Sequence, residues 1–510
     1  MVRRLSALAA LATTALAAAA SAGAGEHPGK VEGRIAALGP NENVQEMAVT
    51  PDGRIVTAGW AINGPAPGFN DFVRVYRAEG GLDPGFGTGG EVYLEGYQDI
   101  AAMTTDSAAR ILVAQAATLR RLNQVGSPDA SFGTGGEVHV DFSDQGASWA
   151  ISDLLVDHSG RILIAGSASP GQSMPGSLVL ARYLPDGAPD AGFGTNGRTV
   201  VPVGSDTGAP ALALQPDGRI VVAAANGNQP PVVGRLSPDG QIDEQFGRGG
   251  FGRVALVRRH ESRDLTAPAS SDWRPLTLAH GRIRVPVASG VFKRGAARIG
   301  VIGLTANGHV DRHFGRRGLA LGPRRQTTEG GEFPEVAVAD SHGSILVAGS
   351  AALGDDLSGD DATALRRFRR NGTLDRTFGR RGIATGTLGS SSGAFEQQLA
   401  MLDADTVVLA EEDTTPKYQR WHGGALTAID AGYDRTEPAY SVRSGCHWLR
   451  IRIRDDSPLD RLVVRFDGQV VRRTTRKRLR LRVRPGLVVS FTAVDAGGNR
   501  ARAKTTVPPC

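Results

Sequence analysis

Few residues in this chain of 510 amino acids have the types and spacing that catalysis requires. Residues Gly85–Gly90 and Gly192–Gly197 both match G-x-G-x-x-G, a turn that binds a dinucleotide when it joins a strand to a helix. Here a strand-like segment follows each match, so we interpret both as structural turns. Ser391 lies in G-x-S-x-G, the motif of an activated serine, but no helix follows it and we interpret the segment as a serine-rich loop.

The candidate metal ligands are equally sparse. Four aspartates between Asp355 and Asp361 offer carboxylate oxygens to a hard cation, but they lack the alternating ladder of a calcium loop and are interpreted as a solvated loop. His309 and His313 are four residues apart, a spacing that brings two imidazoles to one metal only on a helix, and they flank a turn. The sequence therefore predicts no metal, no cofactor and no catalytic residue.

The amino terminus has the three parts of an export signal. Arg3 and Arg4 are followed by the 16-residue apolar stretch Leu5–Ala20 and by a small-residue cleavage site that ends at Ala22. We predict a signal peptide at residues 1–22 and a mature chain of 488 residues (510 − 22) outside the cytoplasm, with no further apolar run of spanning length. The alternative is an uncleaved anchor, although a membrane helix needs about 20 apolar residues.

The composition describes a globular protein with many turns. Hydrophobic residues make up 40% and charged residues 22%, and the 68 glycines and 28 prolines together reach 96 of 510 residues. Such frequent turn residues argue against helix bundles and coiled coils, and the apolar fraction argues against disorder. The elements that position any site are therefore expected to be short strands.

An internal repeat organises most of the chain. The string D-x-x-F-G-x-x-G occurs six times at a mean spacing of about 58 residues. Its phenylalanines are Phe86, Phe132, Phe193, Phe246, Phe314 and Phe378. A second landmark, a turn followed by a β-branched run, recurs seven times between Ile55 and Val407 at the same period. We interpret the repeated Phe as a structural residue that fills the interface between units.

One unit, residues 198–250, contains four runs rich in β-branched residues, separated by turns such as Asp217-Gly218 and Asp239-Gly240. We interpret this unit as a four-stranded antiparallel meander. Because a lone sheet of this size cannot bury both faces, the units must stack, and radial stacking gives a β-propeller. The predicted fold is all-β, a seven-bladed β-propeller over residues 31–435, with six or eight blades as alternatives. The run Val31–Leu38 is predicted to complete the last blade and close the ring.

These repeats resemble a known family. The pairing of PDGRIVTAG or QPDGRIVVA with RLSPDGQIDEQFGRGG is similar to the delta-60 repeat, a β-propeller repeat of exported bacterial proteins, over roughly residues 40–385. The resemblance implies the fold and export. It implies no catalytic residue, and the units around Arg110 and Gly281 depart from the turn pattern.

The carboxy-terminal residues 436–510 form a different pattern. Five short runs rich in β-branched residues follow closely, as in a small β-sandwich, and RFDGQVVRRTT with FTAVDAGGNRARA resembles bacterial immunoglobulin-like modules. Both cysteines lie here. In an exported chain we predict that Cys446 and Cys510 pair, closing a loop of 65 residues (510 − 446 + 1). A free thiol or an intermolecular bridge is the alternative.

Positive charge is concentrated in this last domain. Residues 441–510 hold 17 basic and 5 acidic residues (+12), so residues 1–440 hold 41 and 47 (−6). Strand alternation places Leu479, Leu481 and Val483 inward and a row of arginines outward. The predicted basic face consists of Arg450, Arg452, Arg454, Arg478, Arg480, Arg482 and Arg484. Only five of the 58 basic residues are lysine, so a preference for arginine over lysine holds for the whole chain and does not by itself indicate a function of this domain.

These features predict an exported, noncatalytic binding or scaffold protein of the cell envelope or extracellular matrix. The basic face would attract an anionic envelope polymer, an acidic polysaccharide or extracellular nucleic acid in a salt-dependent manner. A solvated face or docking against the acidic propeller are the alternatives, no protein partner is identifiable, and no motif for sequence-specific nucleic-acid binding is present. The alternative function is an extracellular hydrolase or lyase with its site in the central channel, and a third is a spacer that presents the last domain.

Overall fold

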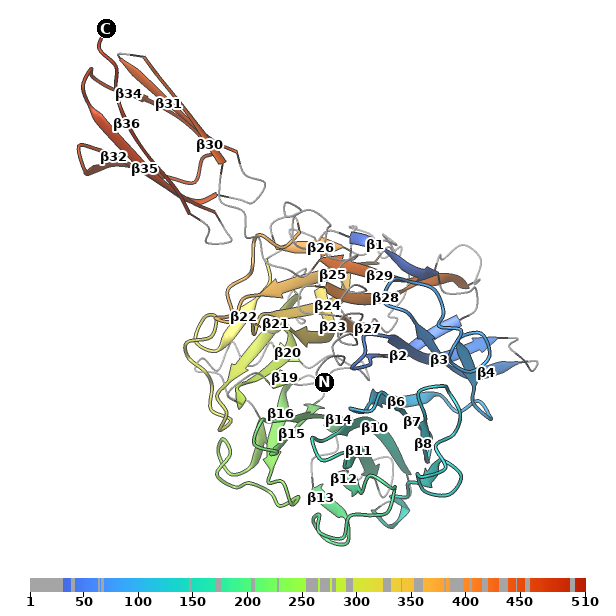
Figure 1. Ribbon diagram of the computed structural model, residues 1–510. Helices are drawn as coiled ribbons and strands as arrows, with labels where there is room; N and C mark the ends of the chain where they lie inside the picture. The colour runs from blue at the N-terminus through green and yellow to red at the C-terminus, as the bar shows by residue number, and fades with distance from the viewer. Residues whose placement is uncertain are drawn as a thin grey trace, which may run out of the picture. The chain divides into compact units, whose positions relative to one another are not determined.

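The computed structural model of the chain consists almost entirely of β-strands (Figure 1). It describes residues 31–37, 42–62, 65, 68–145, 148–169, 176–202, 207–226, 229–253, 265–266, 276–277, 281–289, 297–323, 332–340, 342–352, 361–379, 382–385, 398–402, 406–414, 421–430, 439–445, 447–454, 459–495 and 500–510. Within these residues the single helix is a 3-10 turn, η1 (Ser143–Gln145). No helix of the described part is long and apolar enough to cross a membrane.

The chain divides into two compact units, and residues 29–432 make up the larger one. Its described residues form seven antiparallel sheets, numbered here in chain order. Sheet 1 contains β2 (Glu42–Val49), β3 (Ile55–Ile62), β4 (Phe69–Tyr76) and β5 (Glu91–Tyr93). Sheet 2 contains β6 (Ile100–Thr105), β7 (Ile111–Gln115), β8 (Thr118–Leu122) and β9 (Glu137–His139). Sheet 3 contains β10 (Ser148–Val156), β11 (Ile162–Ser169), β12 (Ser177–Tyr183) and β13 (Arg198–Pro202).

The remaining sheets of this unit follow the same order. Sheet 4 contains β14 (Thr207–Leu214), β15 (Ile220–Asn226), β16 (Gln229–Leu236) and β17 (Phe251–Arg253). Sheet 5 contains β18 (Leu265–Thr266), β19 (Leu276–Thr277), β20 (Ile283–Ser289), β21 (Arg298–Leu304) and β22 (Leu319–Leu321). Sheet 6 contains β23 (Glu332–Ala339), β24 (Ile345–Ala352), β25 (Asp361–Phe368) and β26 (Ile383–Thr385). Sheet 7 contains β27 (Gln398–Met401), β28 (Thr406–Thr414), β29 (Trp421–Asp430) and β1 (Val31–Ala37).

The seven sheets form a closed ring (Figure 1). One strand of each sheet contacts one strand of the next, in the order β2, β6, β10, β14, β19, β23, β27 and back to β2. This is the first strand of the sheet except in sheet 5, where it is β19. Apolar clusters fill the spaces between neighbouring sheets, as where Leu112 and Phe132 of one sheet meet Leu154 and Ile164 of the next. The predicted all-β propeller fold is therefore confirmed.

Strand β1 closes the ring as the sequence predicts. It pairs antiparallel with β29, with Arg34 opposite Thr427 and Ala37 opposite Ala425. The amino-terminal strand therefore completes a sheet whose other strands come from the end of the propeller.

The repeat unit and the sheet are out of phase, which corrects the interpretation of residues 198–250. β13 does not join β14–β16 but pairs with β12 in sheet 3, and β17 supplies the fourth strand of sheet 4. The reason is local, because the turn that contains Phe193 folds β13 back onto β12 as a hairpin. The outermost strand of each sheet therefore lies at the start of the following sequence unit.

The smaller unit includes residues 433–510 and forms a sandwich of two sheets. The three-stranded sheet contains β30 (Ala439–Gly445), β31 (Trp448–Arg454) and β34 (Arg478–Arg482). The four-stranded sheet contains β33 (Gln469–Thr474), β32 (Leu459–Phe466), β35 (Val488–Asp495) and β36 (Arg500–Thr506), in that spatial order. Buried Leu449 and Ile451 from the first sheet pack with Val464 and Phe491 from the second, so the core lies between the sheets.

Candidate functional site

The repeated phenylalanine lies at the seam between sheets. All six are buried, with at most 2% of the residue exposed. The glycine that follows the phenylalanine donates its N–H to a turn carbonyl of the next sheet, as Gly133 does to Asp186 at 2.8 Å and Gly194 to Asp239 at 2.8 Å. At Gly240, whose φ is 86°, an added Cβ would lie 2.7 Å from Phe193 Cε2, so the turn of sheet 4 sits directly on the ring.

An arginine guanidinium lies over the ring of five of these six phenylalanines, and among the described residues none lies over Phe86. The guanidinium carbon lies 4.6 Å from the ring centroid for Arg182 over Phe193, and the Arg182 Nε donates to Asp190 of the same string at 2.7 Å. The same arrangement joins Arg121, Asp129 and Phe132, then Arg235, Asp243 and Phe246, then Arg367, Asp375 and Phe378. We call each set an Arg–Phe–Asp cluster. Arg182 also donates to Pro238 O of the next sheet, so the cluster bonds two sheets together.

In the cluster of Arg367, Asp375 and Phe378, the surroundings of the aspartate favour its ionised form. Burial alone would raise the pKa of Asp375, but Arg367, the Thr377 hydroxyl and Arg369 lower it below its usual range. Sheet 5 departs from the pattern, because Gly303 replaces the arginine and Arg284 from the neighbouring strand covers Phe314 at 4.2 Å. Burial lowers the pKa of Arg284 to about 10. These charged groups form ion pairs and ring contacts inside the propeller, so the repeated string has a structural role.

The predicted basic face lies on the outer surface of the three-stranded sheet of the sandwich. Along β31 the residues alternate between exposed and buried, and along β34 between exposed and half-buried. The exposed positions carry Arg450, Arg452, Arg454, Arg478, Arg480 and Arg482. Leu449, Ile451 and Ile453 point into the core, with Leu479, Leu481 and Val483 packed against it, as the alternation predicts.

Strand register brings these arginines side by side. Arg450 lies opposite Arg480, and Arg452 lies opposite Arg478. Arg443 of β30, which the sequence analysis missed, lies opposite Arg450 and extends the row across three strands. Exposed Trp448 stands at one end of the face, with the Arg450 guanidinium 6.0 Å from its ring. We define the first basic face as Arg443, Arg450, Arg452, Arg454, Arg478, Arg480 and Arg482.

Arg484 differs from the other predicted members. It follows the end of β34, and its Nη2 lies 3.8 Å from Asp467 Oδ2, on the turn between β32 and β33. Among the described carboxylates, none forms an ion pair with the seven arginines of the first basic face. Within the described part of the chain, the positive charges of these seven arginines are therefore not balanced by ion pairs with carboxylates. Arg443 is the fifth residue of β30, a strand that was not predicted from the sequence. Alternation along that strand would have placed it on the same face as the predicted arginines.

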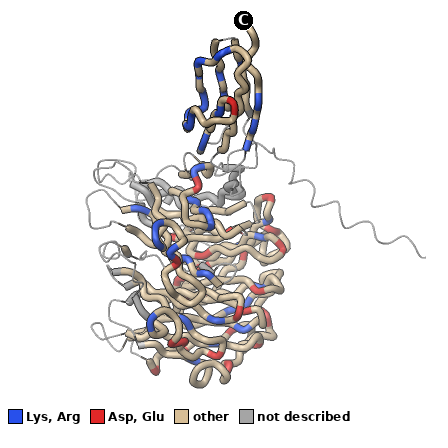
Figure 2. Tube along the Cα trace, turned by 90° about the vertical axis from the view of Figure 1, so that its left-hand side faces the viewer, with Lys and Arg blue, Asp and Glu red and all other residues tan. Residues whose placement is uncertain are grey.

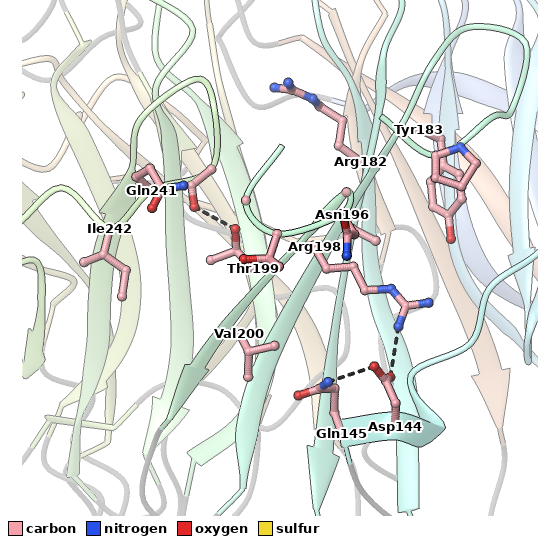
Figure 3. Close-up of a pocket in the computed structure, with 16 residues that line it drawn as sticks. Asp144, Gln145, Arg182, Tyr183, Asn196, Arg198, Thr199, Val200, Gln241 and Ile242 are labelled. Carbon is pink, nitrogen blue, oxygen red and sulfur yellow. Dashed lines mark hydrogen bonds and ion pairs between the residues drawn. The ribbon is translucent and has the colours of Figure 1, made fainter. Parts of the chain in front are cut away.

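A cavity of about 640 Å³ opens on the propeller beside the outer strand β13 (Figure 3). Asp144 and Gln145 of η1 line one side of it, and the turn that holds Gln241 lines another. Arg198 Nη1 lies 2.9 Å from Asp144 Oδ1, and the Thr199 hydroxyl donates to Gly240 O at 2.6 Å. Of the charged residues that line the cavity, Arg198 pairs with Asp144 within the lining, whereas Arg182 pairs with Asp190 outside it.

A second exposed feature of the propeller is a cluster of aromatic rings. Phe69 and Tyr97 are 46% and 42% exposed and stack with their centroids 4.7 Å apart, and Trp60 meets Phe69 edge-on at 5.1 Å. Below them lies buried Asp71, whose Oδ2 accepts the Gln98 N–H at 3.1 Å. Burial raises the pKa of this carboxyl. No sequence spacing indicated this cluster, because its rings come from two strands and a loop.

Polar residues of the inner strands bond to neighbouring sheets. Asp153 Oδ2 accepts the N–H of Leu212 at 2.6 Å, and the Ser152 hydroxyl donates to Pro210 O at 2.7 Å. Gln45 Oε1 likewise accepts the N–H of Ile100 at 3.0 Å. Within the described ranges there is no group of three or more His, Cys, Asp or Glu residues placed to hold a metal ion.

The structure places some of the other candidate residues from the sequence, and the rest lie outside the described residues. Strands β5 and β13 follow the two glycine-rich strings, so neither string opens a helix. His309 and His313 lie in turns around the bridge residue Val310. Ser391, residues 355–360, residues 1–30 and Cys446 lie outside the described residues. Cys510 Sγ lies 3.4 Å from Nε2 of His447, the residue next to Cys446, and the disulfide stays a prediction.

Comparison with known families supports the repeat. Residues 159–193, 215–246 and 342–378 match the family described as "Domain of unknown function (DUF5122) beta-propeller". Each matched segment ends at or next to the phenylalanine of a D-x-x-F-G string. No curated protein matches the chain.

Solved structures match the chain at low sequence identity and with TM-scores below 0.5. PorZ, a surface component of the type-IX secretion system of Porphyromonas gingivalis, is 12% identical with a TM-score of 0.40 over 92% of this chain. This chain spans 59% of the length of PorZ. The polysaccharide lyase Uly1 is 11% identical with a TM-score of 0.45, over 76% of this chain and 90% of that one. Uncomplexed Pyrococcus horikoshii acylaminoacyl peptidase is 9% identical with a TM-score of 0.41, and the match covers 82% of this chain and 59% of the peptidase.

Proposed function

We propose that this protein is an exported, noncatalytic binding protein of the cell envelope or extracellular matrix. In this proposal the propeller has seven blades and serves as an interaction platform, and its exposed cavity and aromatic cluster are the surfaces available for partners. The sandwich, an immunoglobulin-like domain, holds the protein on an anionic polymer such as an acidic polysaccharide through the first basic face. The signal peptide directs export and is removed after residue 22.

The observation that carries the proposal is the register of like charges on the first basic face. Arg443 lies opposite Arg450, Arg450 opposite Arg480, and Arg452 opposite Arg478. Like charges directly opposite one another destabilise a sheet. Folding alone therefore does not account for this pattern, since interspersed acidic or neutral residues would solvate the face as well.

The geometry of the face fits a linear polyanion. Arginines on neighbouring strands stand about 4.8 Å apart, and those two residues apart along one strand stand about 7 Å apart. A polymer with an anionic group on each repeat meets several guanidinium groups at once, and each contact releases counterions. The like-charge repulsion is relieved when the polymer binds. By contrast, an enzyme in the channel needs polar groups available to a substrate, whereas Ser152, Asp153 and Gln45 bond to neighbouring sheets.

The test is binding of the full mature chain to polygalacturonate and dextran sulfate, with uncharged dextran as the control polymer. The site variant is R450Q/R452Q/R480Q. The matched control R248Q/R312Q/R316Q removes the same charge from exposed positions of the propeller. We expect binding at about 50 mM salt that collapses by about 200 mM, with a slope of log K against log salt that falls by roughly 2–3 in the site variant.

The control variant should keep the slope of the unmodified chain. The proposal would be overturned if neither anionic polymer bound at about 50 mM salt. It would also be overturned if both variants lost the same amount of affinity, because the net charge of the protein would then account for the binding. Melting temperatures of both variants establish that each is folded.

A further inference from the structure

The four-stranded sheet of the sandwich carries a second set of cations on its own outer face. Their positions follow from the core, because Leu462, Val464, Phe491, Ala493 and Ala501 are buried between the sheets. The residues that alternate with them on β32, β33 and β36 therefore point away from the core. We define the second basic face as Arg461, Arg465, Arg473, Arg500, Arg502 and Lys504.

The second face is arranged differently from the first. Across the sheet, Arg465 is followed by Ser490 and then Lys504, and Arg461 is followed by Val494 and then Arg500. Cations of β32 and β36 are thus separated by an uncharged residue of β35. The cations of β32 and those of β36 form two rows about 10 Å apart that border a neutral row, and Arg473 of β33 lies beyond β32, opposite Val463. No like charges stand directly opposite one another here, and five of the six cationic residues are exposed, Arg465 being half-buried.

The two basic faces point in opposite directions. The apolar cluster formed by residues such as Ile451 and Val464 lies between the sheets, so each basic face is the outer surface of its own sheet. Packed sheets stand about 10 Å apart, and side chains extend from both outer surfaces. A straight polymer that lies on one face therefore cannot contact the other. Figure 2 shows basic residues along strands throughout this unit, with few acidic ones among them.

We infer that the sandwich binds two anionic polymer chains at once, one on each outer face, and so cross-links them. The inference rests on the proposed function and deepens it, because it turns a single attachment into a junction between polymer chains. Long polymers are then joined into a network in which this protein forms the junctions.

The experiment uses the full mature chain and polygalacturonate of two lengths. With oligomers of about eight units, calorimetry at about 50 mM salt should give two binding sites per protein. With long polymer, light scattering should rise to a maximum at an intermediate protein-to-polymer ratio and fall when either partner is in excess. R450Q/R452Q/R480Q disables the first face and R473Q/R502Q/K504Q the second, with equal loss of charge. Each variant should bind one oligomer and lose the scattering maximum.

The outcomes separate this inference from the proposed function. One oligomer per unmodified protein, with scattering unchanged in R473Q/R502Q/K504Q, would overturn cross-linking and leave single-face binding in place. Scattering that persists in both variants would also overturn it, because self-association of the protein would then join the polymers. Absence of any binding would overturn both proposals together. Sedimentation of the free protein establishes its own oligomeric state before polymer is added.

Discussion

The Arg–Phe–Asp clusters explain why one short string recurs along the propeller. Its phenylalanine fills the seam between sheets, its aspartate pairs with an arginine, and its glycine bonds to the next sheet, as Phe193, Asp190 and Gly194 show. A buried ion pair offsets its desolvation only when the geometry is good and further hydrogen bonds are made. Here the Arg182 guanidinium also reaches a carbonyl of the next sheet and covers the aromatic ring.

Removal of one such ring should be costly. We expect Phe193→Ala to destabilise the propeller by about 3–5 kcal/mol, because it leaves a cavity at the seam and uncovers a buried arginine. The matched control is Phe69→Ala, whose ring is 46% exposed and should cost much less. Thermal and denaturant unfolding of the full chain measure both, and equal melting temperatures for Phe193→Ala and the unmodified chain would contradict burial.

At the same scale, the sequence indicated the phenylalanines but not their arginine partners. The string repeats as a block, whereas the arginine lies on the preceding strand and outside it. A constant spacing was nevertheless present, because the arginine precedes the aspartate by eight residues in the pairs that begin at Arg121, Arg182, Arg235 and Arg367. Only the hairpin geometry shows why eight residues bring these two side chains together.

Strand β1 matters most at the scale of single elements. The sequence predicted its role because Val31–Leu38 had no partner in its own unit and the last unit was short of a strand. The phase of the repeat was harder to predict, because residues 184–197 separate β13 from its true partner β12, whereas only residues 203–206 separate it from β14 in the next sheet. The shorter connection looked like the hairpin. Periodicity alone therefore located the strands in residues 198–250 but assigned β13 to the wrong sheet.

The pairing of β1 with β29 can be tested by a designed cross-link. Arg34 lies opposite Thr427, so Arg34→Cys with Thr427→Cys should form a disulfide and stabilise the propeller by on the order of 4 kcal/mol. The mismatched pair Arg34→Cys with Ala425→Cys should not cross-link, because Ala425 lies opposite Ala37. Electrophoresis with and without reductant and thermal unfolding distinguish the two, and cross-linking of both pairs would argue against the register.

The whole molecule divides its charge between its two units. Removal of the signal peptide leaves residues 23–440 with a net charge of −8, while residues 441–510 carry +12. The sequence alone showed this division and the alternation along β31 and β34. It did not show which strands lie side by side. The like-charge rows therefore required the register of β30, β31 and β34, and the second basic face required that of β32, β33, β35 and β36.

The predicted disulfide belongs to this scale, because it joins the end of the chain to the start of the sandwich. Closure of the 65-residue loop from Cys446 to Cys510 should stabilise the sandwich by roughly 4 kcal/mol. We expect Cys446→Ser with Cys510→Ser to lower the melting temperature of the sandwich transition and to leave the propeller transition unchanged. Calorimetry resolves the two transitions, and two free thiols in the denatured, unreduced protein would contradict the bridge.

The direction of the contacts between sheets determines the order of events during synthesis. In five of the six strings the glycine after the phenylalanine bonds to the sheet that comes next in the chain, as Gly133, Gly194 and Gly247 do, so these seams can form once the following repeat has emerged. β1 must instead wait for β29, about 400 residues later. The first strand to be made is therefore the last to find its partner. Until then it remains an open edge that other chains can pair with, and ring closure sets the pace of maturation.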